Sequence, residues 1–401
     1  MRLRPLATNV GLSLAVLALT LAAAEAVARI LLGRQGGGKE QNEFARYQVY
    51  DPVLGWRDKP NAHVVFFRRE YETELRTNGQ GLRDRERSYE GSAFRVLALG
   101  DSFVEGYSVP FEATVSQVIE QDLNEPGCPF EVINAGVANY STDQEYLAYR
   151  SEGVRYQPRI VVLFLYYNDV LATISSTQYG RPKPVLDFRS VPAIVANQPV
   201  PPPAPPVAPL RPARSRRGSV LWSWTQERLQ HRPRVYKALA AIGLVPPFRP
   251  TYPPREMAVY WRRATPEVDR AWRQVDRILG AMASETSAHG SRLLVAYIPS
   301  RFEVNDRDLE LTRLWYGLDE ASWGRAPVLR RLQSIAEARA IPVLDLTPAL
   351  RGVDRFWQGP YYQYDGHWNV VGHRAAGLAV SQWLRARGWL PPCARASAGS
   401  R

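Results

Sequence analysis

The sequence between residues 95 and 387 alternates short apolar runs with longer stretches of helical spacing. The apolar runs, rich in Val, Ile and Leu, cover residues 95–99, 131–134, 160–166, 292–297 and 342–346. Apolar residues recur with helical spacing over 115–123, 142–153, 266–289, 326–340 and 370–387. Short apolar runs are typical of strands buried on both faces, and helices between them connect parallel strands. The pattern therefore predicts an α/β fold, a three-layer sandwich with a central, mainly parallel sheet.

The chain is predicted to divide into an N-terminal anchor, a linker region and one α/β domain that an insertion interrupts. The boundaries follow changes in composition and fall at 1–34 (anchor), 35–90 (tether and small β element), 91–390 (α/β domain), about 181–254 (Pro/Arg-rich insertion) and 391–401 (tail). Proline is densest at 199–212, where it excludes helix and central strand and favours extended backbone. We interpret the insertion as a mobile spacer, and a lid or partner-binding segment is the alternative.

The N-terminal segment is apolar and nearly long enough to cross a membrane. Residues 6–24 carry no charge and follow Arg2 and Arg4, whereas a span takes roughly 20 apolar residues. One interpretation is a signal peptide cleaved near Ala24-Glu25-Ala26. The other, which we favour, is an uncleaved signal anchor that continues as a helix to Leu32. The two arginines favour a cytoplasmic N-terminus and an exported remainder.

Charge and cysteine content narrow the classes of function. The formal net charge is +12, but the cations are spread along the chain and accompany no nucleic-acid-binding motif. We therefore expect no nucleic acid partner and favour acidic polysaccharide or anionic lipid surfaces. Two cysteines and five histidines form no cluster with metal-ligand spacing, so no metal site is expected. Export permits a disulfide between Cys128 and Cys393, and two unpaired thiols are the alternative.

Polar clusters follow three predicted strands and precede the last predicted helix. In chain order they are Gly100-Asp101-Ser102-Phe103, Asn134-Ala135-Gly136-Val137, Asn168-Asp169 and Asp365-Gly366-His367. Ligands of open α/β sheets bind beyond the carboxyl ends of the strands, so the clusters are expected to converge on one edge. Taken alone, Ser102 is equally explained as a helix cap.

In this order the clusters resemble the Ser, Gly, Asn and His blocks of the SGNH (GDSL) hydrolase superfamily. The resemblance covers about residues 50–387 apart from the insertion. Leu54-Gly55-Trp56, Thr77-Asn78 and Gly81-Leu82-Arg83 look like segments found before the serine in membrane-anchored bacterial members. The resemblance implies the flavodoxin-like SGNH hydrolase fold, no cofactor, and a single-pass protein of the bacterial inner membrane with its catalytic domain in the periplasm. Secretion after signal cleavage is the alternative.

The chemistry of these residues predicts a serine nucleophile with a histidine base. His367 is the histidine that stands beside a carboxylate in such a cluster, so it can take the Ser102 proton and return it to the leaving group. Asp365 is expected to orient His367 and stabilise its charged form. The backbone N–H groups of Ser102 and Gly136 and the side-chain amide of Asn168 are predicted to form the oxyanion hole.

Two positions depart from the superfamily pattern. Members commonly carry the Asp three residues before the His, whereas Asp365 stands two before His367. A similar Asp-x-His arrangement occurs in exopolysaccharide acetyltransferases that resemble this superfamily. Tyr166 stands where many members carry glycine, so the pocket near Asn168 is expected to be narrower or more aromatic. His373 is expected to pack at the start of the last helix rather than act as the base.

We expect a serine esterase that removes an acyl group, such as acetyl, from a carbohydrate or lipid through an acyl-serine intermediate. An O-acyltransferase acting on a cell-surface polysaccharide is the alternative, because a sugar hydroxyl can replace water in the second half-reaction. A catalytically inactive SGNH-like glycan-binding module is a further alternative. Polysaccharide-biosynthesis proteins are candidate partners through the proline-rich insertion.

Overall fold

The structure is a computed structural model that describes residues 4–33, 43–189, 194–203, 219–230, 232–246, 249–355 and 359–392. The chain forms two compact units. One comprises Met1–Gln41 and Pro205–Pro250, and the other comprises Asn42–Ala204 and Thr251–Arg401. The unit boundaries at 204/205 and 250/251 lie inside the predicted insertion, whose first part, residues 181–204, belongs to the larger unit.

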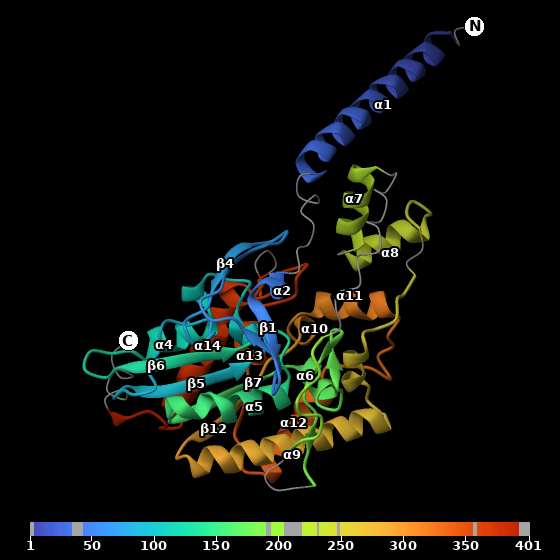
Figure 1. The fold of residues 1–401 in the computed structure, drawn as a ribbon. Coiled ribbons are helices and arrows are strands. Elements are labelled where there is room, and N and C mark those ends of the chain that lie inside the picture. Colours follow the sequence, from blue (N-terminus) through green and yellow to red (C-terminus); the bar gives the residue numbers. More distant parts are fainter. Residues whose placement is uncertain are drawn as a thin grey trace. The chain divides into compact units, whose positions relative to one another are not determined.

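A five-stranded parallel sheet forms the centre of the larger unit (Figure 1). Its strands are β5 (Phe94–Gly100), β6 (Phe130–Gly136), β7 (Ile160–Leu165), β12 (Arg292–Tyr297) and β13 (Val343–Asp345). Their spatial order is β13-β12-β7-β5-β6. Numbered along the chain, this is the flavodoxin-like order 2-1-3-4-5, whose switch point lies between the first and third strands, here β5 and β7. The predicted α/β fold with a central parallel sheet is therefore confirmed.

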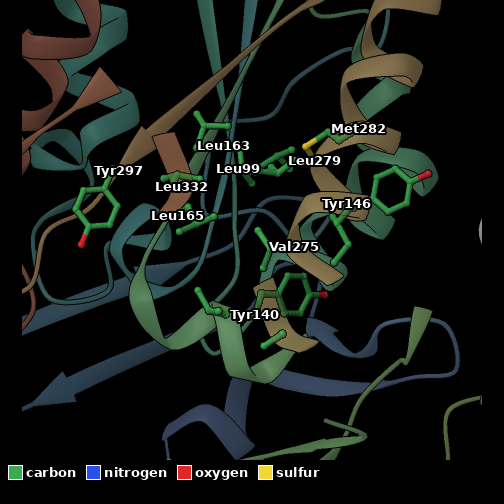
Figure 2. Packing of buried hydrophobic residues seen from close by; sticks show 14 of the residues in the cluster. Leu99, Tyr140, Tyr146, Leu163, Leu165, Val275, Leu279, Met282, Tyr297 and Leu332 are labelled. Carbon is green, nitrogen blue, oxygen red and sulfur yellow. The ribbon is translucent and has the colours of Figure 1, made fainter. Parts of the chain in front are cut away.

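Helices cover both faces of the sheet. One face packs against α4 (Val115–Leu123), α13 (Thr347–Val353) and α14 (Val370–Ala386), and the other against α5 (Thr142–Ser151), α9 (Pro266–Ala288) and α12 (Pro327–Ala338). Alternation along β5 divides the two cores, since Val96 and Ala98 join the first and Leu97 and Leu99 the second. Figure 2 shows the second core, where Leu99 of β5 and Leu163 of β7 lie near Leu279 of α9.

Several short helices were not predicted from apolar spacing. They are α3 (Ser102–Glu105), α6 (Tyr167–Ala172), α10 (Arg301–Val304) and α11 (Asp306–Tyr316). Side-chain caps, which leave no periodic signal, define the starts of α3 and α11: Asp101 accepts from the Phe103 N–H and Asn305 accepts from the N–H groups of Arg307 and Asp308. The 3₁₀ helices are η1 (Phe111–Ala113), η2 (Gly153–Tyr156) and η3 (Arg255–Tyr260), and the two-residue strands are β8 (Thr177–Gln178), β9 (Arg181–Pro182), β10 (Leu186–Asp187) and β11 (Ile194–Val195).

A small β element precedes the sheet, as the alternation over residues 64–78 predicts. It contains α2 (Glu43–Tyr47), the antiparallel pair β1 (Gln48–Asp51) and β2 (Gly55–Asp58), and the antiparallel pair β3 (His63–Phe67) and β4 (Glu72–Arg76). Its apolar side chains, among them Tyr47, Phe66 and Leu75, form a third cluster that includes Tyr107. The element therefore packs against the segment that follows the first sheet strand.

In its described residues, the smaller unit contains α1 (Arg4–Gly33), α7 (Val220–Gln230) and α8 (Pro233–Ala241). Within α1, the stretch Gly11–Ile30 is long and apolar enough to cross a membrane. In the larger unit, Cys128 takes part in a disulfide. Cys393, the only other cysteine of the sequence, lies outside the described residues.

Candidate active site

Ser102 lies where the first sheet strand passes into a helix. β5 ends at Gly100, and Ser102 begins the one-turn helix α3. Asp101 caps this helix, because its Oδ1 accepts the Phe103 N–H at 2.9 Å. Ser102 is partly exposed whereas both of its neighbours are buried. The serine hydroxyl is therefore held at the carboxyl end of the sheet on a fixed turn.

His367 and Asp365 meet Ser102 from the loop before α14. Ser102 Oγ lies 2.8 Å from His367 Nε2, and His367 Nδ1 lies 2.5 Å from Asp365 Oδ1. The second carboxylate oxygen, Oδ2, accepts the Tyr71 hydroxyl at 2.8 Å. The shortened Asp-x-His spacing thus still permits the carboxylate to contact the imidazole, and the structure brings all three predicted residues together.

The electrostatics of the pair favour an ionised carboxylate beside a basic imidazole. Burial alone would raise the pKa of Asp365, but the hydrogen bond and charge of His367 and the Tyr71 hydroxyl outweigh burial and lower the pKa to about 2. Burial disfavours protonation of His367, but the hydrogen bond to Asp365 and its charge outweigh this effect and raise the pKa of His367. An imidazole of raised pKa is a stronger proton acceptor.

The turn between β3 and β4 holds the histidine loop. The Glu70 carboxylate accepts the backbone N–H groups of residues 363–365 at 2.6, 2.8 and 2.9 Å. The Arg69 guanidinium lies 3.7 Å from the centre of the Tyr364 ring, and Tyr71 bonds to Asp365. These positioning residues were missed from the sequence. The only signal was a run of charged and aromatic residues in a hairpin turn, which a solvated turn would show as well.

Aromatic rings surround the imidazole. The Phe103 and Tyr107 rings lie 4.9 and 5.1 Å from the His367 ring, measured between centres. The Tyr166 ring lies 4.7 Å from Phe103. Tyr166 therefore belongs to the aromatic cluster beside the imidazole, and the narrower or more aromatic pocket near Asn168 stays a prediction.

Asn168 comes shortly after β7, the strand that pairs with β5. It lies in the first turn of α6, which Asp169 fixes by accepting the Tyr166 N–H at 2.9 Å. Burial raises the pKa of Asp101 to about 6, and the Phe103 N–H, the charge of His367 and the Asn168 side chain oppose this rise. The Asn168 side chain therefore lies beside Asp101, the residue that precedes Ser102.

The structure does not place Gly136 as an oxyanion-hole donor. Its N–H already donates to Asn134 Oδ1 at 3.1 Å, and the residue is the buried last position of β6. A Cβ at this position would lie 2.3 Å from the backbone nitrogen of Glu105. Glycine is needed here so that α3 can pack directly on β6, which is a structural role rather than a donor role.

Asn139 presents a backbone donor in the loop after β6. It has a left-handed backbone with φ 68°, and within the part of the chain that the structure describes its N–H has no hydrogen-bond acceptor. The Ala138 carbonyl accepts Gln48 Nε2 and Trp56 Nε1 at 3.3 and 3.2 Å. Since the C=O and N–H of a trans peptide point in opposite directions, the Asn139 N–H points away from Gln48 and Trp56. The sequence signal was an asparagine, which tolerates positive φ better than most residues.

Arg83 supports the end of the nucleophile helix. This fully buried side chain donates to the carbonyls of Glu105 and Val109 at 3.0 and 2.7 Å. Asn78 orders the preceding turn, because its Oδ1 accepts the Leu82 N–H at 2.9 Å. The segments around Trp56 and Arg83, noted in the sequence only as a resemblance, thus hold the loops after β6 and β5.

His373 lies at the start of α14 and contacts the start of α4. It is buried, and its Nδ1 accepts the Val115 N–H at 3.1 Å. Burial, with the charge of Arg83, lowers the pKa of His373 to about 3. This histidine is a neutral packing residue. Among the described residues, no group of His, Cys, Asp and Glu side chains is arranged to hold a metal ion.

The fold brings Ser102, His367 and Asp365 together at the carboxyl edge of a parallel sheet. Residues 261–397, which include Asp365 and His367, match the family model described as "SGNH hydrolase-like domain, acetyltransferase AlgX". The matched segment is about a third of the chain, and its similarity agrees with the resemblance to the SGNH superfamily seen in the sequence.

Comparison with solved structures gives similarities of low sequence identity. A lipase/acylhydrolase from Enterococcus faecalis is 14% identical, with 75% of this chain and 98% of that chain covered and a TM-score of 0.36. A catalytic mutant of Axe2, an acetylxylan esterase from Geobacillus stearothermophilus, is 14% identical, with 76% and 99% covered and a TM-score of 0.37. The structure of TesA is 14% identical, with 73% and 98% covered and a TM-score of 0.37. A search of the curated proteins found no match.

Proposed function

We propose that this chain is a serine enzyme acting on acyl esters, with Ser102 as nucleophile and His367 as base. The observation that carries the proposal is the 2.8 Å contact between Ser102 Oγ and His367 Nε2, with Asp365 on the other ring nitrogen. Oγ bonds to the ester carbonyl carbon as its proton passes to Nε2. The same proton then passes to the leaving oxygen as the carbon–oxygen bond of the ester breaks, which leaves an acyl-serine.

Hydrolysis completes the proposed cycle. His367 takes a proton from water, the resulting hydroxide attacks the acyl-serine, and the proton returns to Ser102 Oγ as a carboxylic acid leaves. The ionised Asp365 stabilises the imidazolium that forms in both steps. We assign the oxyanion hole to the Ser102 N–H, the Asn168 amide and, in place of Gly136, the Asn139 N–H. By analogy with other enzymes, each such donor contributes roughly 2.7–4 kcal/mol to the transition state.

An acylated carbohydrate or lipid is the proposed substrate, and acetyl the proposed acyl group. O-acetyl transfer to a sugar hydroxyl is the second candidate. The match of residues 261–397 to a domain described for an acetyltransferase supports this candidate. In the transferase the acyl-serine is attacked by a sugar hydroxyl, from which His367 removes the proton.

We further propose that α1 anchors the protein in a bacterial inner membrane and that the SGNH domain lies on the periplasmic side. The apolar stretch Gly11–Ile30 supports the anchor. Arg2 and Arg4 before this stretch support a cytoplasmic N-terminus. The disulfide at Cys128 is the kind of bond that persists in an oxidising compartment.

The test uses the full-length protein in detergent with a chromogenic acetyl ester, with and without an oligosaccharide acceptor. We expect Ser102→Ala and His367→Ala each to lower kcat by about 10⁴-fold or more. Ser151→Ala, which removes the exposed serine hydroxyl at the last residue of α5, is the matched control and should retain full activity. Unchanged turnover in Ser102→Ala would refute both candidates. Acceptor-dependent ester formation that exceeds hydrolysis would establish the transferase.

A further inference from the structure

The insertion contributes a helical hairpin that is attached to α1. The Glu25 carboxylate in α1 accepts the Ser219 hydroxyl at 2.6 Å and the N–H groups of Val220 and Leu221 at 2.8 and 3.0 Å. Ala28, one turn further along α1, is buried. A carboxylate at a helix N-terminus satisfies N–H groups that lack partners inside the helix and interacts favourably with the helix dipole. The start of α7 is therefore fixed on α1 (Figure 1).

This attachment point coincides with the end of the uncharged stretch. Residues 5–24 carry no charge, and at 1.5 Å per residue they span about 30 Å, the thickness of the hydrocarbon core. Glu25 follows directly and forms an ion pair with Arg29 at 2.8 Å. If α1 crosses a membrane as proposed above, α7 begins where hydrocarbon gives way to headgroups.

Helix α8 carries an apolar stripe that faces solvent in the structure. The stripe is formed by four residues at the i, i+3, i+4 and i+7 positions that place side chains on one helical face, Val235, Ala238, Leu239 and Ile242. Val235 is 49% exposed and Ile242 is 69% exposed. Tyr236, by contrast, is buried and donates to the Pro246 carbonyl, which closes the hairpin on its inner side.

The surroundings of the stripe are cationic and aromatic. Between residues 219 and 250 the sequence contains five Arg or Lys residues and one acidic residue. Two of the cations, Arg234 and Lys237, are exposed on α8 itself. Trp222, in the first turn of α7, is 47% exposed. Tryptophan is enriched at the headgroup level of membranes, and amphipathic helices with basic flanks bind anionic lipid surfaces.

We propose that α8 lies in the membrane interface, with the Val235/Ile242 stripe against the acyl boundary and its cations at anionic headgroups. The bilayer is favoured as the occupant for two reasons. The hairpin is fixed to the end of the anchor helix, and its positive charge complements anionic lipids. The inference rests on the proposed membrane anchoring by α1. The chain then contacts the bilayer at two places, and the proline-rich insertion serves as a second membrane attachment.

The experiment uses the full-length protein in lipid nanodiscs made of phosphatidylglycerol or of phosphatidylcholine, each with a photoreactive phospholipid. Lipid adducts are mapped by mass spectrometry of peptides from residues 219–250. We expect adducts on α8 in phosphatidylglycerol discs, reduced at least about fivefold in the double variant Val235→Ser/Ile242→Ser. Lys237→Gln should lower the preference for phosphatidylglycerol over phosphatidylcholine by about fivefold, since one cation near an anionic surface contributes about 1 kcal/mol.

Tyr252→Ser is the matched control, because it removes a 98% exposed aromatic side chain that is not part of the stripe, and it should leave the adducts unchanged. Equal melting temperatures show that the variants fold. Adducts on α1 without adducts on α8 would overturn the inference while leaving the anchor intact. Cross-links between α8 helices of two chains, in place of lipid adducts, would assign the stripe to a second copy and overturn it. Failure of the chain to enter nanodiscs would overturn the anchor and the inference together.

Discussion

The hydroxyl of Tyr71 provides a sharp test of how the histidine loop is held. Its hydrogen bond to Asp365 Oδ2 joins the N-terminal β element to the carboxylate beside His367. Tyr71→Phe removes this one donor and keeps the ring, which packs 4.8 Å from the Tyr362 ring. The substitution therefore tests orientation of the carboxylate without opening a cavity.

The size of the effect follows from the burial of the pair. The Tyr71 residue is 8% exposed and the Asp365 side chain 14%, so little water can replace the lost donor. A hydrogen bond to a charged group contributes about 1.5–3 kcal/mol, which corresponds to about 10- to 150-fold in rate if it is lost entirely in the transition state. Asp365 keeps its two contacts with His367, to the ring and to the backbone N–H. We therefore expect the lower end, about a tenfold fall in kcat.

The assay is steady-state hydrolysis of a chromogenic acetyl ester, with KM expected to be unchanged because the hydroxyl holds Asp365 rather than substrate. Tyr146→Phe is the control. The Tyr146 hydroxyl in α5 also donates to a carboxylate, that of Glu285 in α9, and the substitution removes this hydroxyl. Both variants should lose a similar amount of thermal stability, but only Tyr71→Phe should lose kcat. If the two variants have the same kcat, the loop is positioned without Tyr71 and the reasoning is refuted.

Three further predictions concern the base, the glycine at the end of β6 and the left-handed loop. Because a base must be neutral to accept a proton and the pKa of His367 is raised above 6.5, kcat/KM should fall on the acid side with a midpoint above pH 6.5. Asp365→Asn should move this midpoint to lower pH and lower kcat, and a pH profile with an unmoved midpoint would contradict the assignment. Gly136→Ala should lower stability by about 1–3 kcal/mol through overpacking and reduce activity. Gly352→Ala places a Cβ in open space on helix α13, so it should leave stability unchanged or raise it by up to about 1 kcal/mol in the same thermal melts. Asn139→Gly should retain activity because glycine adopts positive φ freely. Asn139→Val should lower kcat about tenfold because a β-branched residue is strained at positive φ. Equal kcat values for the two variants would exclude the loop from the oxyanion hole.

The sequence predicted the elements whose residues are buried on both sides. The run at 160–166 became β7 because every position of Ile160–Leu165 is buried, so no polar residue interrupts the apolar signal. Ser102 was found in a short polar cluster that follows a buried strand. His367 was found in a short polar cluster that precedes the last helix. The nucleophile was therefore predicted from the order of the polar clusters along the chain, since Ser102 alone is equally explained as a helix cap.

Contacts between distant segments account for what the sequence did not show. Glu70 and Tyr71 act on a loop almost three hundred residues further along, and neither periodicity nor composition records such a pairing. Gly136 was predicted as an oxyanion-hole donor, but the group that lies closest to it is the backbone of α3. The Asn134 side chain decides whether the Gly136 N–H is available to a substrate. Only the structure shows that Asn134 Oδ1 accepts a hydrogen bond from this N–H.

The position of the insertion divides the catalytic residues between two halves of one domain. The larger unit is built from Asn42–Ala204, which supplies Ser102 and strands β5 to β7, and Thr251–Arg401, which supplies His367 and strands β12 and β13. The pairing of β7 with β12 joins them through six backbone positions in register. A protease cut between residues 205 and 218 would thus leave nucleophile and base on separate polypeptides inside one folded domain. The protein is in this sense a natural candidate for fragment complementation, in which two inactive chains regain activity only when β7 and β12 pair.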